Sequence, residues 1–179
     1  MKSTFIPATG LRVLVFFFVV VGATSMGTAQ ANNAFGFNSP DIAGFPTGAA
    51  ELTGGGAYNL ATGFVHSGGG FRCIASVQQG PLNGCLAGQG IRWDTAALLP
   101  STTFKCTGAT SEPQKTANTS ADTVVLVADF YRQGDGIDES FTAKMIVSEV
   151  DLPGNPGMNV WIQGVGCGAA IVNFNIPRR

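Results

Sequence analysis

Histidine and charged residues are scarce in this chain of 179 residues, and their scarcity excludes several kinds of chemistry. His66 is the one histidine, so any Ser/His/Asp or Cys/His mechanism would have to use it, and no G-x-S-x-G nucleophile sequence accompanies it. Charged residues make up 12% of the chain and the net charge is −1, so there is no basic field to attract a phosphate backbone or anionic lipid. The common hydrolase triads and a nucleic-acid partner are therefore not expected.

A long hydrophobic run is also missing. The apolar run at residues 13–21 is shorter than the roughly 20 residues that a helix needs to cross a bilayer. It follows Lys2 and Arg12 and is succeeded by small residues that end in Ala29-Gln30-Ala31, which is the pattern of a secretory signal peptide. We predict a leader over residues 1–31, cleavage after Ala31, a secreted or periplasmic location, and no membrane span after cleavage.

Cysteine pairs with the spacing of a zinc site are absent as well. The four cysteines all follow the predicted leader, and thiols in an exported chain oxidise and stay oxidised. We expect two disulfides, and of the three possible pairings we favour Cys73 with Cys85 and Cys106 with Cys167.

No segment shows the 3.6-residue period of an amphipathic helix, whereas one stretch has the pattern of a long β-hairpin. Residues 124–131 are almost continuously apolar, which predicts a strand covered on both faces. Phe141, Ala143, Met145 and Val147 alternate with polar residues, with Ile146 as the exception. The polar segment between the two arms contains glycine and aspartate and predicts a turn.

The remaining chain contains short strand-like segments separated by glycine-rich turns. We predict an all-β antiparallel sandwich of about eight or nine strands, with a closed barrel as the alternative. Residues 32–48 have no period and are expected to form an N-terminal arm, so that residues 49–179 form the single domain.

Phe71-x-Cys73 and Phe104-x-Cys106 each place an aromatic ring and a sulfur on one strand face, and we expect the two strands to share one core. The triplets at 54–56 and 68–70 are expected to be turns or bulges and not phosphate loops, because no helix follows either one.

Paired carboxylates are the one catalytic option that needs no histidine, because a glycosidase requires two acids roughly 5 to 9 Å apart. Asp129, Asp94 and Glu139 are the candidates. Asp129 lies in an otherwise apolar segment, where an unpaired buried charge is costly, so we expect a partner among Arg132, Arg92 and Arg72 or a position near solvent. A structural role for Asp129 is favoured over a catalytic one.

Two binding sites are further alternatives. Asp135, Asp138 and Glu139 cluster at the hairpin tip and offer oxygen ligands for a weakly bound calcium ion, although a solvated acidic turn is the favoured explanation. Trp161, with Arg92 and Asp94, is a candidate for contact with a ligand. Packing in the core is the favoured alternative for Trp161.

Residues 52–73, 90–95 and 104–106, together with the central hairpin and residues 160–167, resemble small secreted bacterial proteins with no assigned activity. The resemblance covers most of the chain after the leader and implies a bacterial exported protein, but it brings no ligand, cofactor or catalytic residue. The sequence therefore predicts a disulfide-stabilised β-domain with a non-catalytic binding or structural role at the cell exterior and an unidentified ligand or protein as its partner. An extracellular carbohydrate-active hydrolase is the alternative.

Overall fold

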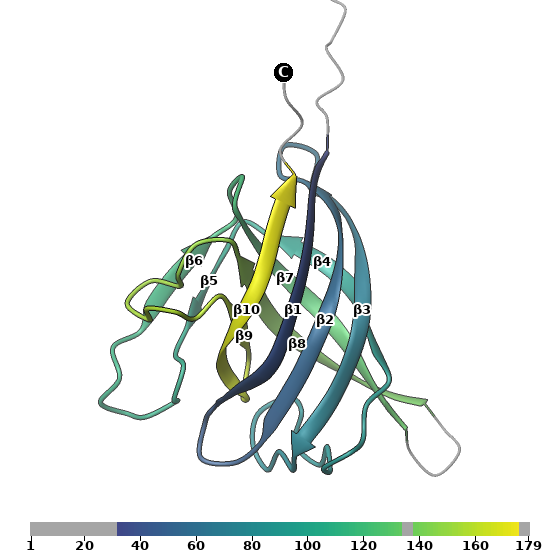
Figure 1. The fold of residues 1–179 in the computed structure, drawn as a ribbon, viewed down its shortest axis with the longest axis vertical. Helices are drawn as coiled ribbons and strands as arrows, with labels where there is room; N and C mark the ends of the chain where they lie inside the picture. Colours follow the sequence, from purple (N-terminus) through teal and green to yellow (C-terminus); the bar gives the residue numbers. More distant parts are fainter. Residues whose placement is uncertain (1–31, 134–137, 176–179) are drawn as a thin grey trace, which may run out of the picture.

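The protein is described by a computed structural model over residues 32–133 and 138–175, and this part of the chain contains ten β-strands and no helix. Eight strands form a closed barrel in the order β1-β10-β9-β8-β7-β4-β3-β2, with antiparallel neighbours throughout (Figure 1). The barrel strands are β1 (Asn33–Gly44), β2 (Ala49–Asn59), β3 (Phe64–Ala75), β4 (Arg92–Leu99), β7 (Thr123–Gln133), β8 (Asp138–Ser148), β9 (Val160–Ile162) and β10 (Gly166–Asn175). A separate two-stranded sheet, β5 (Ser101–Phe104) and β6 (Lys115–Asn118), is inserted between β4 and β7. No helix in the described ranges is long and apolar enough to cross a membrane.

The closed barrel shows that the expected sandwich is wrong and that the stated alternative describes the sheet. Alternating strands suit either architecture, and the difference lies in whether the first and last strands pair. β1 pairs with both β10 and β2 and so closes the sheet. This strand comes from residues 32–48, the expected N-terminal arm, and its Phe35, Phe37 and Ile42 are buried in the barrel.

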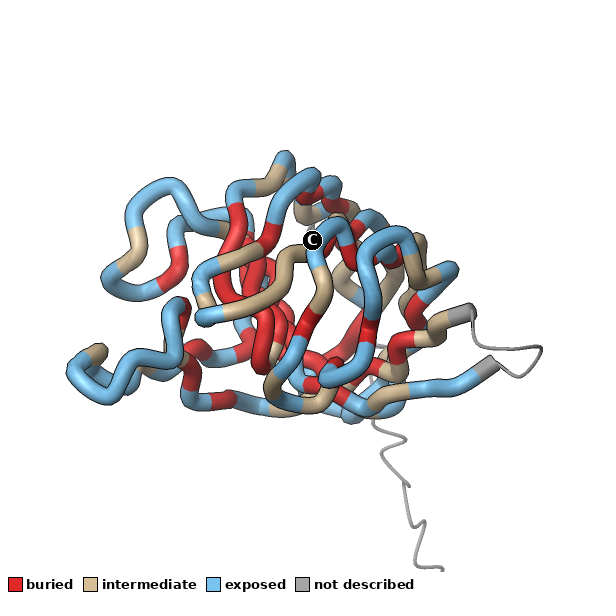
Figure 2. The backbone as a smooth tube through the Cα atoms, turned by 90° about the horizontal axis from the view of Figure 1, so that it is seen from below, coloured by how far each residue is buried: buried red, intermediate tan, exposed pale blue. Residues whose placement is uncertain are grey.

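The barrel interior is filled with buried side chains. Figure 2 shows the buried residues in red along the backbone of the barrel strands. The predicted central hairpin is present as β7 and β8, and Val124, Leu126, Ala128 and Phe130 of β7 point inward. The inward residues of β8 are Ala143, Met145 and Val147, as the alternation predicted. A barrel of eight strands has an interior of the size that side chains can fill completely.

A second hydrophobic layer covers the outside of β7, β8 and β9. Val125 and Ile146 point out of the barrel, yet each is 0% exposed because the β5–β6 hairpin lies over them. The layer also contains Phe104 and Cys106, so the expectation that they share one core with Phe71 and Cys73 is wrong. It also explains why Ile146 broke the alternation of its strand.

Both expected disulfides are confirmed. Cys73–Cys85 joins β3 to the loop before β4. Val77 and Leu82 of this loop contribute to the barrel core. Cys106–Cys167 joins the loop after β5 to β10 and lies in the second layer. Two intramolecular disulfides are consistent with an oxidising, extracytoplasmic compartment.

The glycine triplets lie on β2 and β3 and not in turns. Gly54 pairs with Gly69, and a Cβ atom on Gly69 would lie 1.9 Å from the Thr53 carbonyl oxygen. A Cβ atom on Gly54 would lie 2.6 Å from the ring of Trp93, whose Nε1–H donates to the same carbonyl of Thr53 at 3.0 Å. The glycines therefore allow two strands and a buried indole to approach closely.

Candidate functional site

The sheet register brings together two of the three candidate catalytic acids, Asp94 and Asp129. Asp94 of β4 lies directly opposite Asp129 of β7, and Asp129 in turn lies opposite Thr142 of β8. Their neighbours Trp93 and Phe130 are fully buried inside the barrel, so both carboxylates project from its outer wall. Sequence reasoning named both residues, but the pairing of β4 with β7 across the inserted hairpin was needed to place them together.

Each carboxylate of this pair has one polar partner. The carboxylate of Asp94 lies 3.5 Å from Nε of Arg92, and both side chains are about half exposed, at 55% and 50%. The guanidinium of Arg92 also lies over the ring of Tyr131, 4.4 Å from its centroid. Asp129 accepts a 2.6 Å hydrogen bond from Oγ1 of Thr142.

The expected arginine partner of Asp129 is absent from the ion pairs of the described residues. Arg132 pairs instead with Glu139, Arg92 with Asp94, and Arg72 with Glu51. Asp129 does not need such a partner, because its strand presents it outward at intermediate exposure and not in the apolar interior. The apolar residues around Asp129 in the sequence lie on other parts of β7, which face either the barrel core or the second hydrophobic layer.

The pair is electrostatically unfavourable as it stands, because like charges directly opposite each other on adjacent strands destabilise a sheet. Two ionised carboxylates only accept hydrogen bonds, and each retains acceptor capacity beyond its one partner. The arrangement therefore suits a ligand that supplies several donors.

A hollow of about 340 Å³ lies beside Asp94. Its lining includes His66, Ser67, Gly68 and Thr95. A Cβ atom on Gly68 would lie 2.8 Å from Oδ1 of Asp94, so the bare backbone leaves room for the carboxylate and for whatever approaches it.

Serine, histidine and aspartate all line this hollow, but they do not form a catalytic triad. Ser67 and His66 are consecutive on β3, so their side chains project to opposite faces of the sheet. Ser67 Oγ contacts Oγ1 of Thr95, which also donates to the Ser67 carbonyl at 3.1 Å. The serine hydroxyl is thus engaged across the strands and not by an imidazole.

Glu139, the third candidate acid, lies apart from the other two. It pairs with Arg132 across the β7–β8 hairpin, through a 2.7 Å hydrogen bond from Nε and a second contact from Nη2. Arg132 also donates to the Gly84 carbonyl at 2.6 Å. Glu139 therefore has a structural role at the end of the hairpin.

The proposed calcium ligands cannot be assembled from the described residues. Asp135 lies outside the described residues, as does the side chain of Asp138, and Glu139 is engaged by Arg132. Among the residues that the structure describes, no group of three or more His, Cys, Asp or Glu side chains could hold a metal ion.

Trp161 is 4% exposed, in line with the favoured packing role, and faces the second layer. Its Nε1–H donates to the Lys105 carbonyl at 2.8 Å, and its ring packs against Phe104 with centroids 5.8 Å apart. In this position the indole offers no face to a ligand. Arg92 and Asp94, proposed with it, are the two candidates that do face solvent.

Sequence reasoning missed Thr142, Tyr131 and His66 as neighbours of the acidic pair. All three are placed there by cross-strand register, which a single sequence does not specify when a hairpin is inserted between the strands. No protein-family model, curated protein or solved structure matches this chain, so the geometry carries the functional argument.

Proposed function

We propose that this protein is an exported, non-catalytic binding module and that its ligand site is the outer wall formed by Arg92, Asp94 and Asp129 with the hollow beside Gly68. The observation that carries the proposal is the location of the polar groups. The barrel interior is filled by the core, whereas the acids and the arginine project from an open wall. A binding surface of this kind needs a stable scaffold, which the closed sheet and two disulfides supply.

The chemistry of the wall favours a neutral, polyhydroxylated ligand such as a glycan. Two carboxylates accept hydrogen bonds from neighbouring hydroxyl groups, and Arg92 donates to ring or hydroxyl oxygens. The glycine backbone lets a ring approach closely. An anionic ligand would meet two carboxylates, Asp94 and Asp129, against the single guanidinium of Arg92.

The alternative, a carbohydrate-active hydrolase, rests on the same pair of acids. Directly opposite residues on antiparallel strands have Cβ atoms about 4.5 to 5.5 Å apart, which is compatible with the short carboxyl separation of retaining glycosidases. Binding is favoured because both acids lie on an open wall, where neither is enclosed in the desolvated setting that a general acid requires.

One experiment separates the two functions. The exported protein is run through native gels containing soluble neutral polysaccharides (glucan, xylan, mannan or galactan), and the same mixtures are assayed for new reducing ends. A binding module is retarded in at least one gel and releases no reducing ends. The Asp94→Asn variant should lose this retardation, while the exposed control Glu149→Gln should keep it. Release of reducing ends that Asp129→Asn abolishes would establish the hydrolase. Normal mobility in every gel with no hydrolysis would refute both.

A further inference from the structure

A second hollow lies on the outer wall of the barrel next to the hollow beside Asp94. It has a volume of about 420 Å³, and its lining includes Asn38, Glu51, Thr53, Arg72 and Ile91. Gly70 also lines this hollow, whereas Gly68 lines the one beside Asp94. The two glycines are two residues apart on β3, so both face outward and the two hollows are neighbours along one strand.

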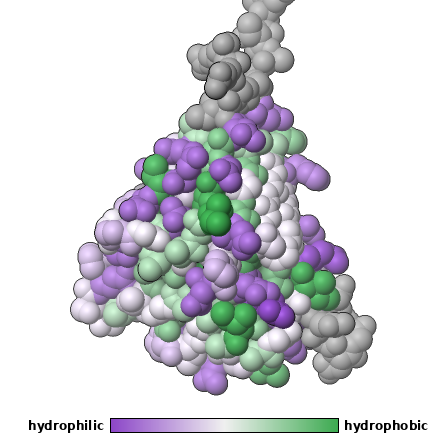
Figure 3. All heavy atoms as spheres, in the orientation of Figure 1, coloured by the Kyte–Doolittle hydropathy of each residue, from purple (hydrophilic) through white to green (hydrophobic). Residues whose placement is uncertain are grey.

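Backbone forms the floor between the two hollows. On β2, Gly55 lies opposite Gly68, and Thr53 lies opposite Gly70. The largest side chain among these four residues is that of Thr53. Figure 3 shows the wall from outside, with a broad pale band along β2 and β3. A ligand that lies along β3 therefore meets a continuous floor from one hollow to the other.

Arg92 flanks this floor without closing it. It lies opposite Gly70 on β4, but its guanidinium lies over the ring of Tyr131 on β7. Because β7 is on the far side of β4 from β3, the arginine leans away from the floor. Its N–H groups can donate to a ligand from this rim.

The second hollow offers hydrogen-bonding groups without a net charge. Glu51 and Arg72 lie opposite each other on β2 and β3 and form an ion pair, with 2.9 Å between the carboxylate and Nε. Asn38 adds an amide that both donates and accepts, and Ile91, which is 43% exposed, adds apolar surface. A sugar ring presents hydroxyl groups and an apolar C–H face, so this hollow suits the same neutral ligand as the first one.

We propose that the two hollows are subsites of one groove and that the ligand is a linear neutral glycan that lies along β3 and occupies both. This inference rests on the proposed binding function and adds the shape and length of the ligand. From His66 in the first hollow to Arg72 in the second, β3 extends about 20 Å at about 3.3 Å per residue, which exceeds the length of a single sugar ring several times. Each hollow alone is near the lower end of the range of about 300 to 1,000 Å³ for ligand pockets, whereas the two together lie well within it.

Calorimetric titration of the disulfide-bonded protein with oligosaccharides of increasing length tests the proposal. The oligosaccharides are prepared from the polysaccharide that retards the protein in the native gel. The affinity should rise by at least about tenfold from the shortest oligosaccharide that binds to the longest, because hydrogen bonds to Glu51 and Arg72 are charge-assisted. Binding that is equally tight at every length would overturn the two-subsite groove and leave the proposed binding function intact. Binding of no oligosaccharide and no polysaccharide would overturn both.

Two variants locate the gain in affinity in the second hollow. Arg72→Gln removes the guanidinium there, and loss of an ion pair whose side chains are 52% and 41% exposed costs little stability. Gly70→Val raises a branched side chain between the hollows, where its Cβ atom would meet only Cγ2 of Thr53, at 3.2 Å. Each variant should bind the longest oligosaccharide no more tightly than the shortest and should bind the shortest as the wild type does. An Arg72→Gln protein that keeps the whole gain with length would overturn the proposal.

Gly36→Val is the matched control for a valine on this wall. A Cβ atom on Gly36 would meet only the Gly54 carbonyl oxygen, at 3.9 Å, and Gly36 is not among the residues that line either hollow. This variant should bind every oligosaccharide as the wild type does, and a loss of affinity equal to that of Gly70→Val would contradict the position of the groove. Asp94→Asn should weaken binding at every length, which distinguishes failure of the first site from failure of the second hollow.

Discussion

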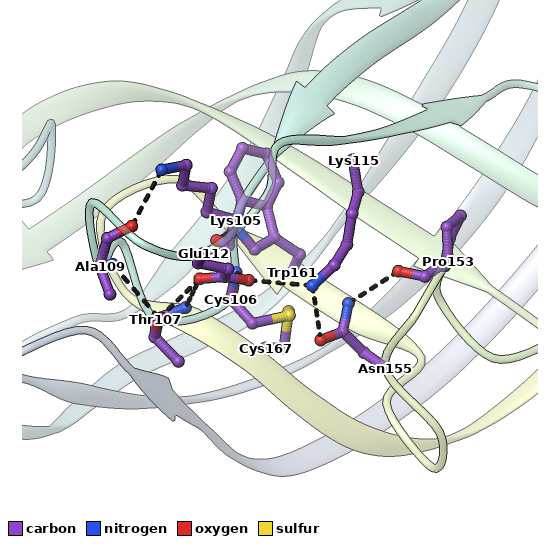
Figure 4. Close-up of polar contacts among 10 residues, drawn as sticks. All are labelled: Lys105, Cys106, Thr107, Ala109, Glu112, Lys115, Pro153, Asn155, Trp161 and Cys167. Atoms are coloured by element: carbon purple, nitrogen blue, oxygen red, sulfur yellow. Dashed lines mark hydrogen bonds and ion pairs between the residues drawn. A yellow bond between two sulfur atoms is a disulfide. The ribbon is translucent and has the colours of Figure 1, made fainter.

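Glu112 should contribute more to stability than the other acids of the described surface, because its carboxylate fastens the second layer. Oε1 accepts hydrogen bonds from the Cys106 amide at 2.8 Å and from Nζ of Lys115 at 3.0 Å. Oε2 accepts from the Thr107 amide at 2.7 Å and from the Thr107 hydroxyl at 2.6 Å. Lys115 also donates to Asn155 at 3.1 Å, so the carboxylate holds together the disulfide loop, β6 and the turn before β9 (Figure 4).

The variant Glu112→Gln keeps the size of this side chain and removes its charge. One oxygen becomes an NH₂ group, and in either orientation that group faces two hydrogen-bond donors. Two charge-assisted bonds are lost and their donors are left without an acceptor in a site where the Glu112 side chain is only 10% exposed. Each such bond contributes about 1.5 to 3 kcal/mol, and after local relaxation we expect a total loss of about 2 to 4 kcal/mol.

The loss should depend on pH in a specific direction. Burial by itself raises the pKa of Glu112, but hydrogen bonds from Thr107, from the Cys106 and Thr107 amides and from Lys115 outweigh it and lower the pKa from 4.5 to about 2. A carboxylate with a depressed folded-state pKa stabilises the protein fully above its unfolded pKa and loses that contribution as the pH falls toward the folded one. The difference between wild type and Glu112→Gln should therefore shrink between about pH 4.5 and pH 2.

Urea unfolding of both proteins with intact disulfides, at neutral pH and at steps down to about pH 2, measures this difference. Glu149→Gln, at an exposed acid, is the matched control and should change stability by less than about 0.5 kcal/mol. Glu112→Gln with wild-type stability at neutral pH, or with a deficit that is constant with pH, would refute the assignment of these hydrogen bonds.

Four further substitutions test the barrel and its wall. Gly69→Ala should destabilise the protein by about 2 kcal/mol or more, because its Cβ atom would lie 1.9 Å from a backbone oxygen, while Gly36→Ala should be nearly neutral in the same thermal unfolding assay. Tyr58→Phe should cost about 1 to 2 kcal/mol by chemical denaturation, since the hydroxyl donates to the Ser120 carbonyl at 2.6 Å. Burial raises the pKa of Tyr58 to about 12, so its contribution falls as the pH rises from about 10 to 12, and ultraviolet titration of the phenol checks this. Asp129→Asn should leave the unfolding midpoint unchanged or raise it, with a gain of up to about 1 kcal/mol from relieved repulsion, and a clear loss of stability would contradict the outward position of this acid, where it accepts a hydrogen bond from Thr142 but has no ion pair among the described residues.

The sequence predicted the central hairpin well because its pattern is local. Alternation along residues 141–147 identified the inward side chains of Ala143, Met145 and Val147. The almost continuously apolar 124–131 segment predicted cover on both faces, which is confirmed at Val125 but is wrong for the outward Val127, Asp129 and Tyr131, which are at intermediate exposure. Pairing of the cysteines was also anticipated. The hairpin depends on period and the Cys73–Cys85 pairing on proximity, which a single chain records directly, whereas Cys106 and Cys167 are separated by 61 residues.

Closure of the sheet and the composition of the site were not predictable in the same way. The pairing of β1 with β10 joins the two ends of the described chain, and nothing in the glycine- and phenylalanine-rich sequence of β1 specifies its partner. The sequence around Asp129 shows only an acid among apolar residues, whereas its energetics depend on Asp94 and Thr142 across two strand pairings. The core to which Phe104 belongs is unpredictable for the same reason. The local pattern of its strand does not show whether that strand lies in the barrel or in a separate sheet outside it.

The most direct test of the proposed binding wall is a set of amide NMR spectra of the disulfide-bonded protein, recorded with and without each soluble neutral polysaccharide. We expect one of these glycans to shift amide signals in a continuous area of β3, β4, β7 and β8 around Gly68, Asp94 and Asp129, and the shifts to vanish in Asp94→Asn. The absence of shifts with every glycan, or shifts gathered in the second layer around Trp161, would contradict the assignment of the site to the Asp94–Asp129 wall.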